Sequence, residues 1–254
     1  MEVYFEKILL PILIILVFLV IALAVLYYNP TIAILGYHGF AKDKASSSYF
    51  VIDINEFEEQ LKYLKKHNYR TLTLDEFYDY KQNNKKFPHK CVLITMDDGY
   101  QSNYDLAFPL LKKYNMNATV FCVGSNIENN SNGYMNLQTL EKLKTEYPNI
   151  EIASHSYALH EKGNIFKGKD SLRKDFSKFN KIIQTKYFAY PYGDYNQDAI
   201  DILKENNFNL AFSFGPGKKH RKVKHNDSNY EIPRLCISEG MPMWKFALRI
   251  ILPF

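Results

Sequence analysis

The sequence predicts an α/β protein: a distorted (β/α) barrel of seven or eight strands, preceded by one N-terminal transmembrane helix. After Pro30, short apolar runs alternate with amphipathic stretches, and this alternation favours parallel strands joined by right-handed crossovers. Before Pro30, one uncharged run rich in Leu, Ile and Val is long enough to cross a bilayer. The composition, 46% hydrophobic and 23% charged, excludes a disordered, collagen-like or coiled-coil chain.

The uncharged run extends from Ile8 to Tyr27, and at about 1.5 Å per residue it matches the thickness of a bilayer core. A cleaved signal peptide is the alternative to an uncleaved anchor. The run is longer than the apolar part of a usual signal peptide, and bulky residues follow Ala22 and Ala24, so we favour the anchor. We therefore expect a membrane anchor at residues 1–30 and one domain at residues 31–254.

Strands are expected where a short apolar run is bounded by glycine or polar residues. The clearest is CVLITMDDG, which begins at Cys91 and ends abruptly in two carboxylates and a glycine. Similar runs recur between amphipathic stretches, at a spacing that makes each strand parallel to the one before it. The expected strands are Thr31 to Tyr37, Thr71 to Leu74, Cys91 to Gly99, Ala118 to Gly124, Ile150 to Ser154, Tyr187 to Gly193, Leu210 to Phe214 and Ile232 to Ile237.

Helices are expected where apolar residues recur every three or four positions. The first covers Glu56 to His67, with Asp53 or Asn55 as its cap, and Asp75 is expected to cap the second. The final segment, Met243 to Phe254, is amphipathic, and because it is short we expect it to pack on the barrel rather than touch the membrane. The other helices are expected near Asp75 to Tyr80, Tyr104 to Tyr114, Leu137 to Tyr147, Leu172 to Ile183 and Ala199 to Asn206.

Charge and cysteine content exclude two other classes of protein. The formal net charge is +5, and the longest basic stretch, Lys218 to Lys224, is not joined to any recognition motif, so no nucleic-acid partner is expected. Cys91, Cys122 and Cys236 are odd in number and widely spaced. They are expected to be buried free thiols rather than a disulfide framework or a metal cage.

Polar residues follow several of the expected strands, and in a parallel barrel such strand ends converge on one mouth. Because side chains at that mouth come from different strands, residues far apart in the sequence can share one site. The residues at these ends are His38, Asp97, Asp98, His155, His160 and Tyr192.

Adjacent aspartates at the end of an apolar strand repel each other and lose water, which is unfavourable unless a cation is bound. Asp97 or Asp98 could instead cap the following helix. The histidines of HSYALH, His155 and His160, favour metal binding, because two histidines and a carboxylate bind a divalent transition metal and leave positions open. Since successive strand residues point in opposite directions, one aspartate can be a ligand while its neighbour acts as a base.

Two motifs of this chain resemble those of the polysaccharide deacetylases, the carbohydrate esterase group that includes chitin, peptidoglycan and poly-N-acetylglucosamine deacetylases. TMDDG, Thr95 to Gly99, is similar to the first family motif, and HSYALH, His155 to His160, is similar to the second. The resemblance covers about Ile34 to Ile237, which is most of the expected domain. It implies that Asp97 is the catalytic base and that Asp98 and the two histidines bind a divalent ion, commonly zinc.

The third family motif, usually Arg-x-Pro-Tyr, is altered here, because Ala189 stands where the arginine is expected. Pro191 and Tyr192 are present, so the resemblance still implies that the backbone N–H of Tyr192 stabilises an oxyanion. The absent guanidinium would normally orient the base. Arg234 is a candidate substitute, and a surface salt bridge is the alternative role for it.

A second departure concerns the general acid, because no histidine follows His225. His38 lies at the end of the first expected strand, and the poly-N-acetylglucosamine deacetylase-like branch of the family has a histidine in this early place. The first and last strands of a closed barrel are neighbours, so a histidine on either can reach the same mouth. We expect His38 to be the general acid, with a purely structural histidine as the alternative.

The expected reaction is hydrolysis of N-acetyl groups on an N-acetylglucosamine-containing glycan of the cell envelope. Two alternatives share the site: hydrolysis of O-acetyl esters, and glycan binding without catalysis, which the absent arginine suggests. A non-haem iron oxygenase would use the same ligand set, but the Asp-Asp pair argues against it. The expected partners are an acetylated amino-sugar polysaccharide or oligosaccharide and, through residues 8–27, the membrane. We expect a single-pass protein of the cell membrane with its catalytic domain extracellular.

Overall fold

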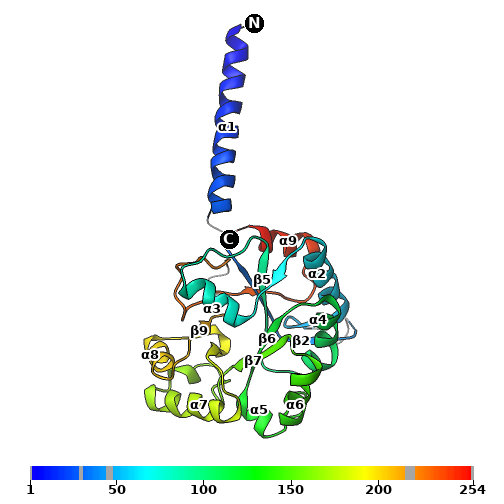
Figure 1. Ribbon diagram of the computed structural model, residues 1–254, viewed down its shortest axis with the longest axis vertical. Helices are drawn as coiled ribbons and strands as arrows, with labels where there is room; N and C mark the ends of the chain where they lie inside the picture. The colour runs from blue at the N-terminus through cyan, green and yellow to red at the C-terminus, as the bar shows by residue number, and fades with distance from the viewer. Residues whose placement is uncertain (1, 29–30, 44–47, 215–220, 253–254) are drawn as a thin grey trace.

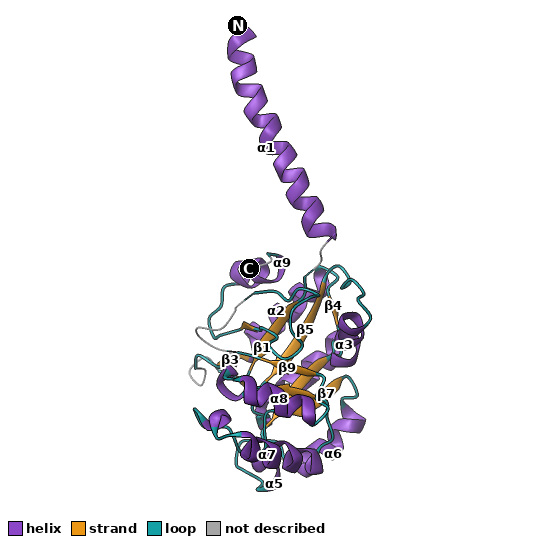
Figure 2. Cartoon of the chain, turned by 90° about the vertical axis from the view of Figure 1, so that its left-hand side faces the viewer, coloured by secondary structure: helices purple, strands orange, loops and turns teal. Residues whose placement is uncertain are grey.

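A parallel β-sheet, curled into a distorted barrel, organises the chain after residue 31 in the computed structural model (Figure 1). Helices lie outside this sheet, as Figure 2 shows. Within helix α1, Glu2–Tyr28, side chains are described only for residues 8–21. The structure describes residues 2–28, 31–43, 48–214 and 221–252.

The sheet has eight strands, as the alternating sequence pattern predicted, and the paired strands are parallel. Its order is β10-β1-β5-β6-β7-β8-β9, and the short β4 pairs with the beginning of β5. This order places β5 inside the sheet, between β1 and β6, so the two aspartates that follow it lie away from the sheet edges. The strands are β1 (Ala33–Tyr37), β4 (Arg70–Thr71), β5 (Cys91–Met96), β6 (Ala118–Cys122), β7 (Ile150–Ser154), β8 (Tyr187–Ala189), β9 (Leu210–Phe212) and β10 (Leu235–Cys236).

The segment that leads into β10 joins the two edges of the sheet. Ile232 forms a parallel bridge with Phe212 of β9, and Leu235 then pairs with Leu35 of β1. Arg234 lies between these two pairings, with its side chain fully buried. The fold therefore places the positively charged side chain of Arg234 inside the barrel, at the point where the first and last strands approach each other.

Apart from α5, the helices of the barrel lie near the positions that the apolar periodicity predicted. Helix α4 is preceded by a π-helical turn, Asn103–Ala107, so the one predicted helix there has two parts. The helices of the barrel are α2 (Ile54–Lys66), α3 (Leu74–Gln82), α4 (Phe108–Tyr114), α5 (Gly124–Glu128), α6 (Leu137–Glu146), α7 (Lys169–Ile182), α8 (Gln197–Glu205) and α9 (Met243–Ile251).

The N-terminal caps of two helices test the local predictions. Asp53 caps α2 and accepts a hydrogen bond from the backbone N–H of Asn55 at 2.7 Å, which confirms one of the two predicted alternatives. The prediction for the next helix was wrong, because Thr73 and not Asp75 caps α3. Thr73 has an extended backbone and exchanges hydrogen bonds with Glu76 in a capping box, whereas Asp75 already lies in the first turn.

Packing of the C-terminal segment on the barrel, which the sequence predicted, is confirmed. Phe246 and Ile250 of α9 are buried, and the ring of Phe246 meets that of Tyr63 on α2 edge to face at 6.0 Å. Helix α5 was not predicted, and neither were the strands β2 (Gly39–Ala41) and β3 (Val51–Asp53), which form a separate two-stranded parallel sheet. The three cysteines are buried free thiols, as predicted.

Helix α1 projects away from the barrel (Figures 1 and 2). Its large apolar side chains between Ile8 and Ile21 are exposed. In the part of the chain that the structure describes, no helix has both the length and the apolar character that crossing a membrane requires. The predicted span, Ile8 to Tyr27, lies partly outside the residues with described side chains.

Candidate metal and catalytic site

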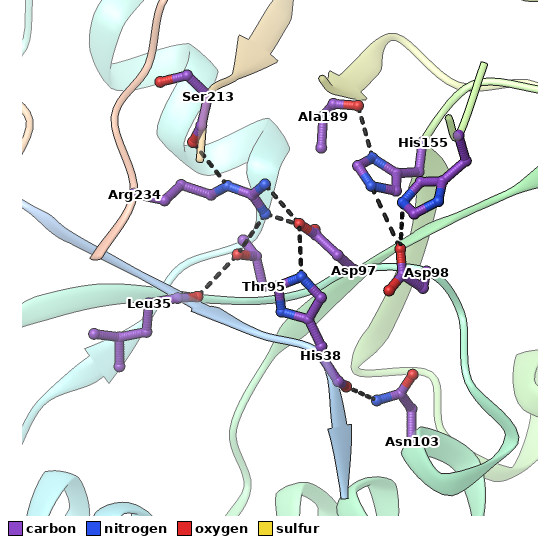
Figure 3. Close-up of polar contacts among 11 residues, drawn as sticks. Leu35, His38, Thr95, Asp97, Asp98, Asn103, His155, Ala189, Ser213 and Arg234 are labelled. Carbon is purple, nitrogen blue, oxygen red and sulfur yellow. Dashed lines mark hydrogen bonds and ion pairs between the residues drawn. The ribbon is translucent and has the colours of Figure 1, made fainter. Parts of the chain in front are cut away.

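The residues predicted from strand ends do meet at one place, where Figure 3 shows His38, Asp97, Asp98 and His155. His38 follows β1, the two aspartates follow β5, and His155 follows β7. Arg234 reaches the same place from the segment before β10, and the ring of Tyr192 stacks on that of His160 at 5.2 Å. The convergence of parallel strands at their carboxyl ends therefore assembles every predicted site residue.

Three of these side chains form a set that could hold a metal ion. One ligand atom each from Asp98, His155 and His160 lies within 4.8 Å of the others. Oδ1 of Asp98 is 3.6 Å from Nε2 of His155 and 2.9 Å from Nε2 of His160. Two imidazoles and one carboxylate are the ligand set that favours a divalent transition metal.

The orientation of His155 suits a metal ligand. Its Nδ1 lies 2.8 Å from the carbonyl oxygen of Ala189, so Nδ1 carries the proton that is donated to this carbonyl. Burial lowers the pKa of His155 to about 4, which keeps the ring neutral at pH 7. The lone pair of Nε2 is then directed toward Asp98, as Figure 3 shows. A backbone carbonyl that fixes a ligand histidine in this way is typical of metal sites.

The carboxylate of Asp98 provides a test of whether the site fits an ion. Oδ1 is buried, and within the described residues it receives no hydrogen bond of acceptable geometry, although both imidazoles are near. A buried carboxylate oxygen without a donor is unfavourable unless a cation compensates it. The residues present therefore fit a divalent cation.

The backbone directs the two neighbouring aspartates to different partners. The N–H of Asp97 continues the strand pairing by donating to the carbonyl of Tyr37 at 3.0 Å. Asp98 has a φ of 70°, a left-handed conformation that turns the chain immediately after the strand. Asp97 consequently faces the interior of the barrel and Asp98 faces the two histidines (Figure 3).

Asp97 forms a bidentate ion pair with Arg234. The Arg234 Nη1 lies 2.6 Å from Oδ1, and the second guanidinium nitrogen lies 2.8 Å from Oδ2 of Asp97. Burial, the largest single effect, would raise the pKa of Asp97. The charge and hydrogen bonds of Arg234, together with the charges of His155 and His38, outweigh burial and hold this pKa below its ordinary value. The carboxylate therefore stays ionised beside the metal-ligand set.

Arg234 is held in one orientation by the rest of the barrel mouth. Its Nε donates to the carbonyl of Ser213 at 3.2 Å, and Nη1 also donates to the hydroxyl of Thr95 at 3.3 Å. The rings of Phe121 and Phe214 lie against the guanidinium. Of its two predicted alternative roles, the surface salt bridge is wrong, because Arg234 is fully buried on Asp97. Arg234 therefore supplies Asp97 with a buried guanidinium, which the alanine at position 189 cannot provide.

His38 is a second neighbour of Asp97, besides Arg234. Its Nε2 is 4.0 Å from Oδ2 of Asp97, and its ring packs against the rings of Phe50 and Phe214 at 4.6 and 5.1 Å. Burial lowers the pKa of His38, and the charge of Asp97 acts in the opposite direction. Nδ1 of His38 is buried and has no hydrogen-bond partner among the described residues. The side chain is thus placed to exchange a proton with a group at the mouth.

Tyr192 reaches the mouth from a tight turn after β8. Its φ is 58° and its side chain is 48% exposed, so its ring is available at the surface of the site. The next residue, Gly193, also has a positive φ, and a Cβ there would lie 1.6 Å from the carbonyl oxygen of Phe214. Only glycine fits this position, and it lets the turn approach the β9 end of the barrel.

One residue near the site was not predicted. Asn103, in the π-helical turn, donates to the backbone carbonyl of His38 at 2.6 Å and so holds the end of β1 (Figure 3). The sequence carries no signal for this contact, because the two residues lie 65 positions apart and an asparagine in a helix has no special pattern.

The fold and the site define a class of protein. A parallel α/β barrel with an Asp/His/His ligand set, and a second ionised carboxylate beside it, has the arrangement of a mononuclear metal-dependent hydrolase. Residues 84–211 match the family model described as polysaccharide deacetylase. The chain belongs to the polysaccharide deacetylase family.

Curated relatives agree with this assignment. The chain is 35% identical over 209 residues to a poly-beta-1,6-N-acetyl-D-glucosamine N-deacetylase of Staphylococcus epidermidis, an alignment that covers 77% of this chain and 70% of the relative. A protein of the same name from Staphylococcus aureus is 31% identical over 214 residues, covering 79% and 72% of the two chains.

Solved structures show the same fold. The Streptococcus pyogenes deacetylase PplD in complex with acetate superimposes with a TM-score of 0.75, covering 87% of this chain and 99% of that chain at 22% identity. IcaB from Ammonifex degensii gives a TM-score of 0.71, covering 87% and 97% at 24% identity.

Proposed function

We propose that this protein removes N-acetyl groups from poly-β-1,6-N-acetylglucosamine, a polysaccharide of the cell envelope. The observation that carries the reaction type is the buried Asp97, held ionised by Arg234 beside the Asp98, His155 and His160 set. The names of the staphylococcal relatives, at 35% and 31% identity, support the β-1,6-linked substrate.

The side chains divide the reaction between them. Asp98, His155 and His160 would hold a divalent ion, which would supply Lewis-acid chemistry that polarises a carbonyl group and acidifies water. The carboxylate of Asp97 accepts the proton of the attacking water, while Arg234 keeps this carboxylate oriented and charged. The backbone N–H of Tyr192 stabilises the negative charge on the former acetamide oxygen.

His38 completes the reaction by passing a proton to the departing amine, which is too basic to leave as an anion. Because its lowered pKa leaves the resting imidazole neutral, this proton is the one that Asp97 takes from water. Its Nε2 lies 4.0 Å from Oδ2 of Asp97, so the proposed acid and base are neighbours (Figure 3). The products are acetate and a glucosamine residue with a free amine. Among divalent ions we propose zinc, since Zn²⁺ commonly binds imidazole and carboxylate ligands while leaving a position open.

The experiment replaces Asp97 with Asn and measures acetate released from a β-1,6-linked N-acetylglucosamine oligomer. We expect D97N to lose about 10²- to 10⁴-fold in kcat, the usual contribution of a positioned base. D105N, at an exposed aspartate hydrogen-bonded to Gln101, is the matched control and should retain wild-type turnover. Undiminished acetate release by D97N would show that the base is assigned incorrectly.

Paired substrates test the substrate class. The wild-type protein should release acetate from the β-1,6-linked oligomer faster than from its β-1,4-linked isomer and faster than from an O-acetylated sugar. Faster release from the O-acetyl ester would instead indicate an esterase. No release from any of the three would indicate a glycan-binding protein without activity.

We also propose that the chain works outside the cell membrane, attached through the apolar segment from Ile8 to Tyr27. The uncharged sequence of this segment supports the proposal, and so does the exposure of its apolar side chains between Ile8 and Ile21. The proposed substrate, a polysaccharide of the cell envelope, lies on that side of the membrane.

A further inference from the structure

The loop that carries the two histidine ligands is held by a buried carboxylate on another element. Asp175, on helix α7, directs one carboxylate oxygen to the backbone N–H of Tyr157 and the other to the N–H of Ala158, each at 2.7 Å. Both amides lie between His155 and His160. The Asp175 side chain is therefore bonded to the middle of the segment that separates the two ligands.

The opposite edge of the same loop is held by helix α5. The backbone N–H of Gly124 donates to the carbonyl of Ser156 at 3.0 Å, and the N–H of Ser125 donates to the carbonyl of Tyr157 at 2.8 Å. Backbone groups of three consecutive loop residues are thus bonded from two sides. These contacts come from α5 and α7, neither of which contributes a metal ligand.

Gly124 permits this close approach. A Cβ at this position would lie 2.9 Å from Cδ2 and 3.3 Å from Cα of Tyr157, and 3.0 Å from a ring carbon of Phe179 on α7. A methyl group there would push α5, the loop and α7 apart. Gly124 and Asp175 therefore both support the packing of the loop between α5 and α7.

The loop needs external support because its backbone is strained. Ser156 has a φ of 71°, which a residue with a side chain rarely adopts and which costs of the order of 1 kcal/mol or more. His155 is oriented by the carbonyl of Ala189, but His160 lies at the far end of the loop with 31% of its side chain exposed. The position of His160 relative to Asp98 consequently depends on the path of the loop.

Burying the charged side chain of Asp175 is energetically unfavourable, which argues that this carboxylate has a specific structural role. Burial raises the pKa of Asp175 to about 6, and the two amide hydrogen bonds act in the opposite direction. A neutral side chain of similar size on this face of α7 would avoid the cost of burying a charge but could not accept both hydrogen bonds.

We propose that Asp175 is a positioning residue of the metal site: it holds the loop between the two histidines on the path that brings His160 to Asp98. The proposal deepens the proposed function and rests on the metal site assigned there. The expected consequence of losing the carboxylate is weaker metal binding, since supports behind metal ligands commonly change metal affinity by 10- to 100-fold.

The experiment compares the full-length wild-type protein with D175N, in which one carboxylate oxygen becomes an NH₂ group that cannot accept from the loop. Zn²⁺ affinity is measured by competition with a chromophoric chelator, and the melting temperature is measured in EDTA. We expect at least a 10-fold weaker affinity for D175N, with kcat largely recovered at saturating Zn²⁺. D170N is the matched control, because Asp170 lies on the same helix with its side chain 90% exposed, and it should bind Zn²⁺ like the wild type.

If D175N does not fold, G124A provides the second variant, because it displaces the same loop from the α5 side without touching a charge. We expect G124A also to weaken Zn²⁺ binding by about 10-fold. Wild-type affinity in a folded D175N or, failing that, in G124A overturns the positioning role and leaves the proposed function intact. A wild-type protein that binds no divalent ion overturns the proposed function itself.

Discussion

At the scale of single residues, the Asp97–Arg234 pair is the contact on which the chemistry depends most directly. A buried carboxylate without a partner would lose much of its charge, whereas the bidentate guanidinium keeps it ionised and fixes its plane. Alanine at position 189 removed the arginine that the family motif places there, and the barrel supplies the guanidinium from position 234 instead. This contact supports the proposal that Asp97 is the base and that the protein is catalytically active.

Replacing Arg234 with Lys tests the need for the bidentate pair. Lysine keeps a positive charge but cannot make two parallel hydrogen bonds, so the base becomes mobile and its pKa rises. We expect kcat to fall about 10- to 100-fold with a smaller change in KM. Because Asp97 works when ionised, a raised pKa should also move the acid limb of the kcat/KM profile to higher pH.

The matched control for this variant is R221K. Arg221 also makes a bidentate pair, with Asp227 at 2.6 and 2.7 Å, but outside the barrel mouth. R221K should leave both kcat and the position of the acid limb unchanged. An R234K profile that superimposes on the wild-type profile would contradict the role given to Arg234.

At the scale of elements, the strands also carry buried polar groups at the end away from the site. These groups affect the free energy of unfolding. Glu151 in β7 is partly buried, and its carboxylate accepts from the N–H of Leu74 at 3.4 Å and from the hydroxyl of Thr119 at 3.2 Å. Burial raises the pKa of Glu151 to about 7, and the charge of Asp75 adds to this effect. Strand β7 therefore carries a carboxyl group that resists ionisation at the end opposite His155.

This raised pKa predicts a pH dependence of stability. Between about pH 4.5 and pH 7 the folded state binds more protons at Glu151 than the unfolded state does, so the free energy of unfolding falls as pH rises through this window. E151Q removes the cost of ionisation and should be more stable than the wild type at pH 8 by about 1–3 kcal/mol, with little difference near pH 4.5.

Urea unfolding at pH 4.5, 6 and 8 measures this difference. E141Q, at an exposed glutamate of α6, is the control and should follow the wild-type pH profile. A difference between E151Q and the wild type that is the same at all three pH values would contradict the raised pKa.

At the scale of the whole molecule, the barrel brings the carboxyl ends of β1, β5 and β7 and the segment before β10 to one mouth, while α1 projects from the body elsewhere (Figure 1). The division into residues 1–30 and 31–254 stays a prediction. The site is assembled entirely from side chains of the second part.

Removal of residues 1–30 tests this division together with the proposed location. We expect the full-length chain to sediment with the membrane fraction and the shortened chain to remain in the supernatant. The kcat of the shortened chain on a soluble β-1,6-linked oligomer should equal that of the full-length chain, because no site residue is removed. A full-length chain that stays in the supernatant would contradict membrane attachment.

The sequence alone determined the parts of this protein that depend on local pattern. Apolar runs and their spacing predicted the parallel barrel, and the polar residues that follow these runs, such as Asp97, Asp98 and His155, were predicted to meet because parallel strands end on the same side. The residues alone predicted a metal site made of the two histidines and one of the two aspartates, and the family resemblance assigned Asp98 as the ligand.

Only the tertiary structure decided the contacts between distant elements. Asp97 and Arg234 are 137 positions apart, and the sequence could name Arg234 only as one of two alternatives. The support of the histidine loop by Asp175 was not predicted at all, because a single aspartate on an amphipathic helix looks like a solvent-facing residue until α7 packs against the loop. Such contacts depend on how elements pack, and neither composition nor periodicity records which buried side chain faces which backbone amide.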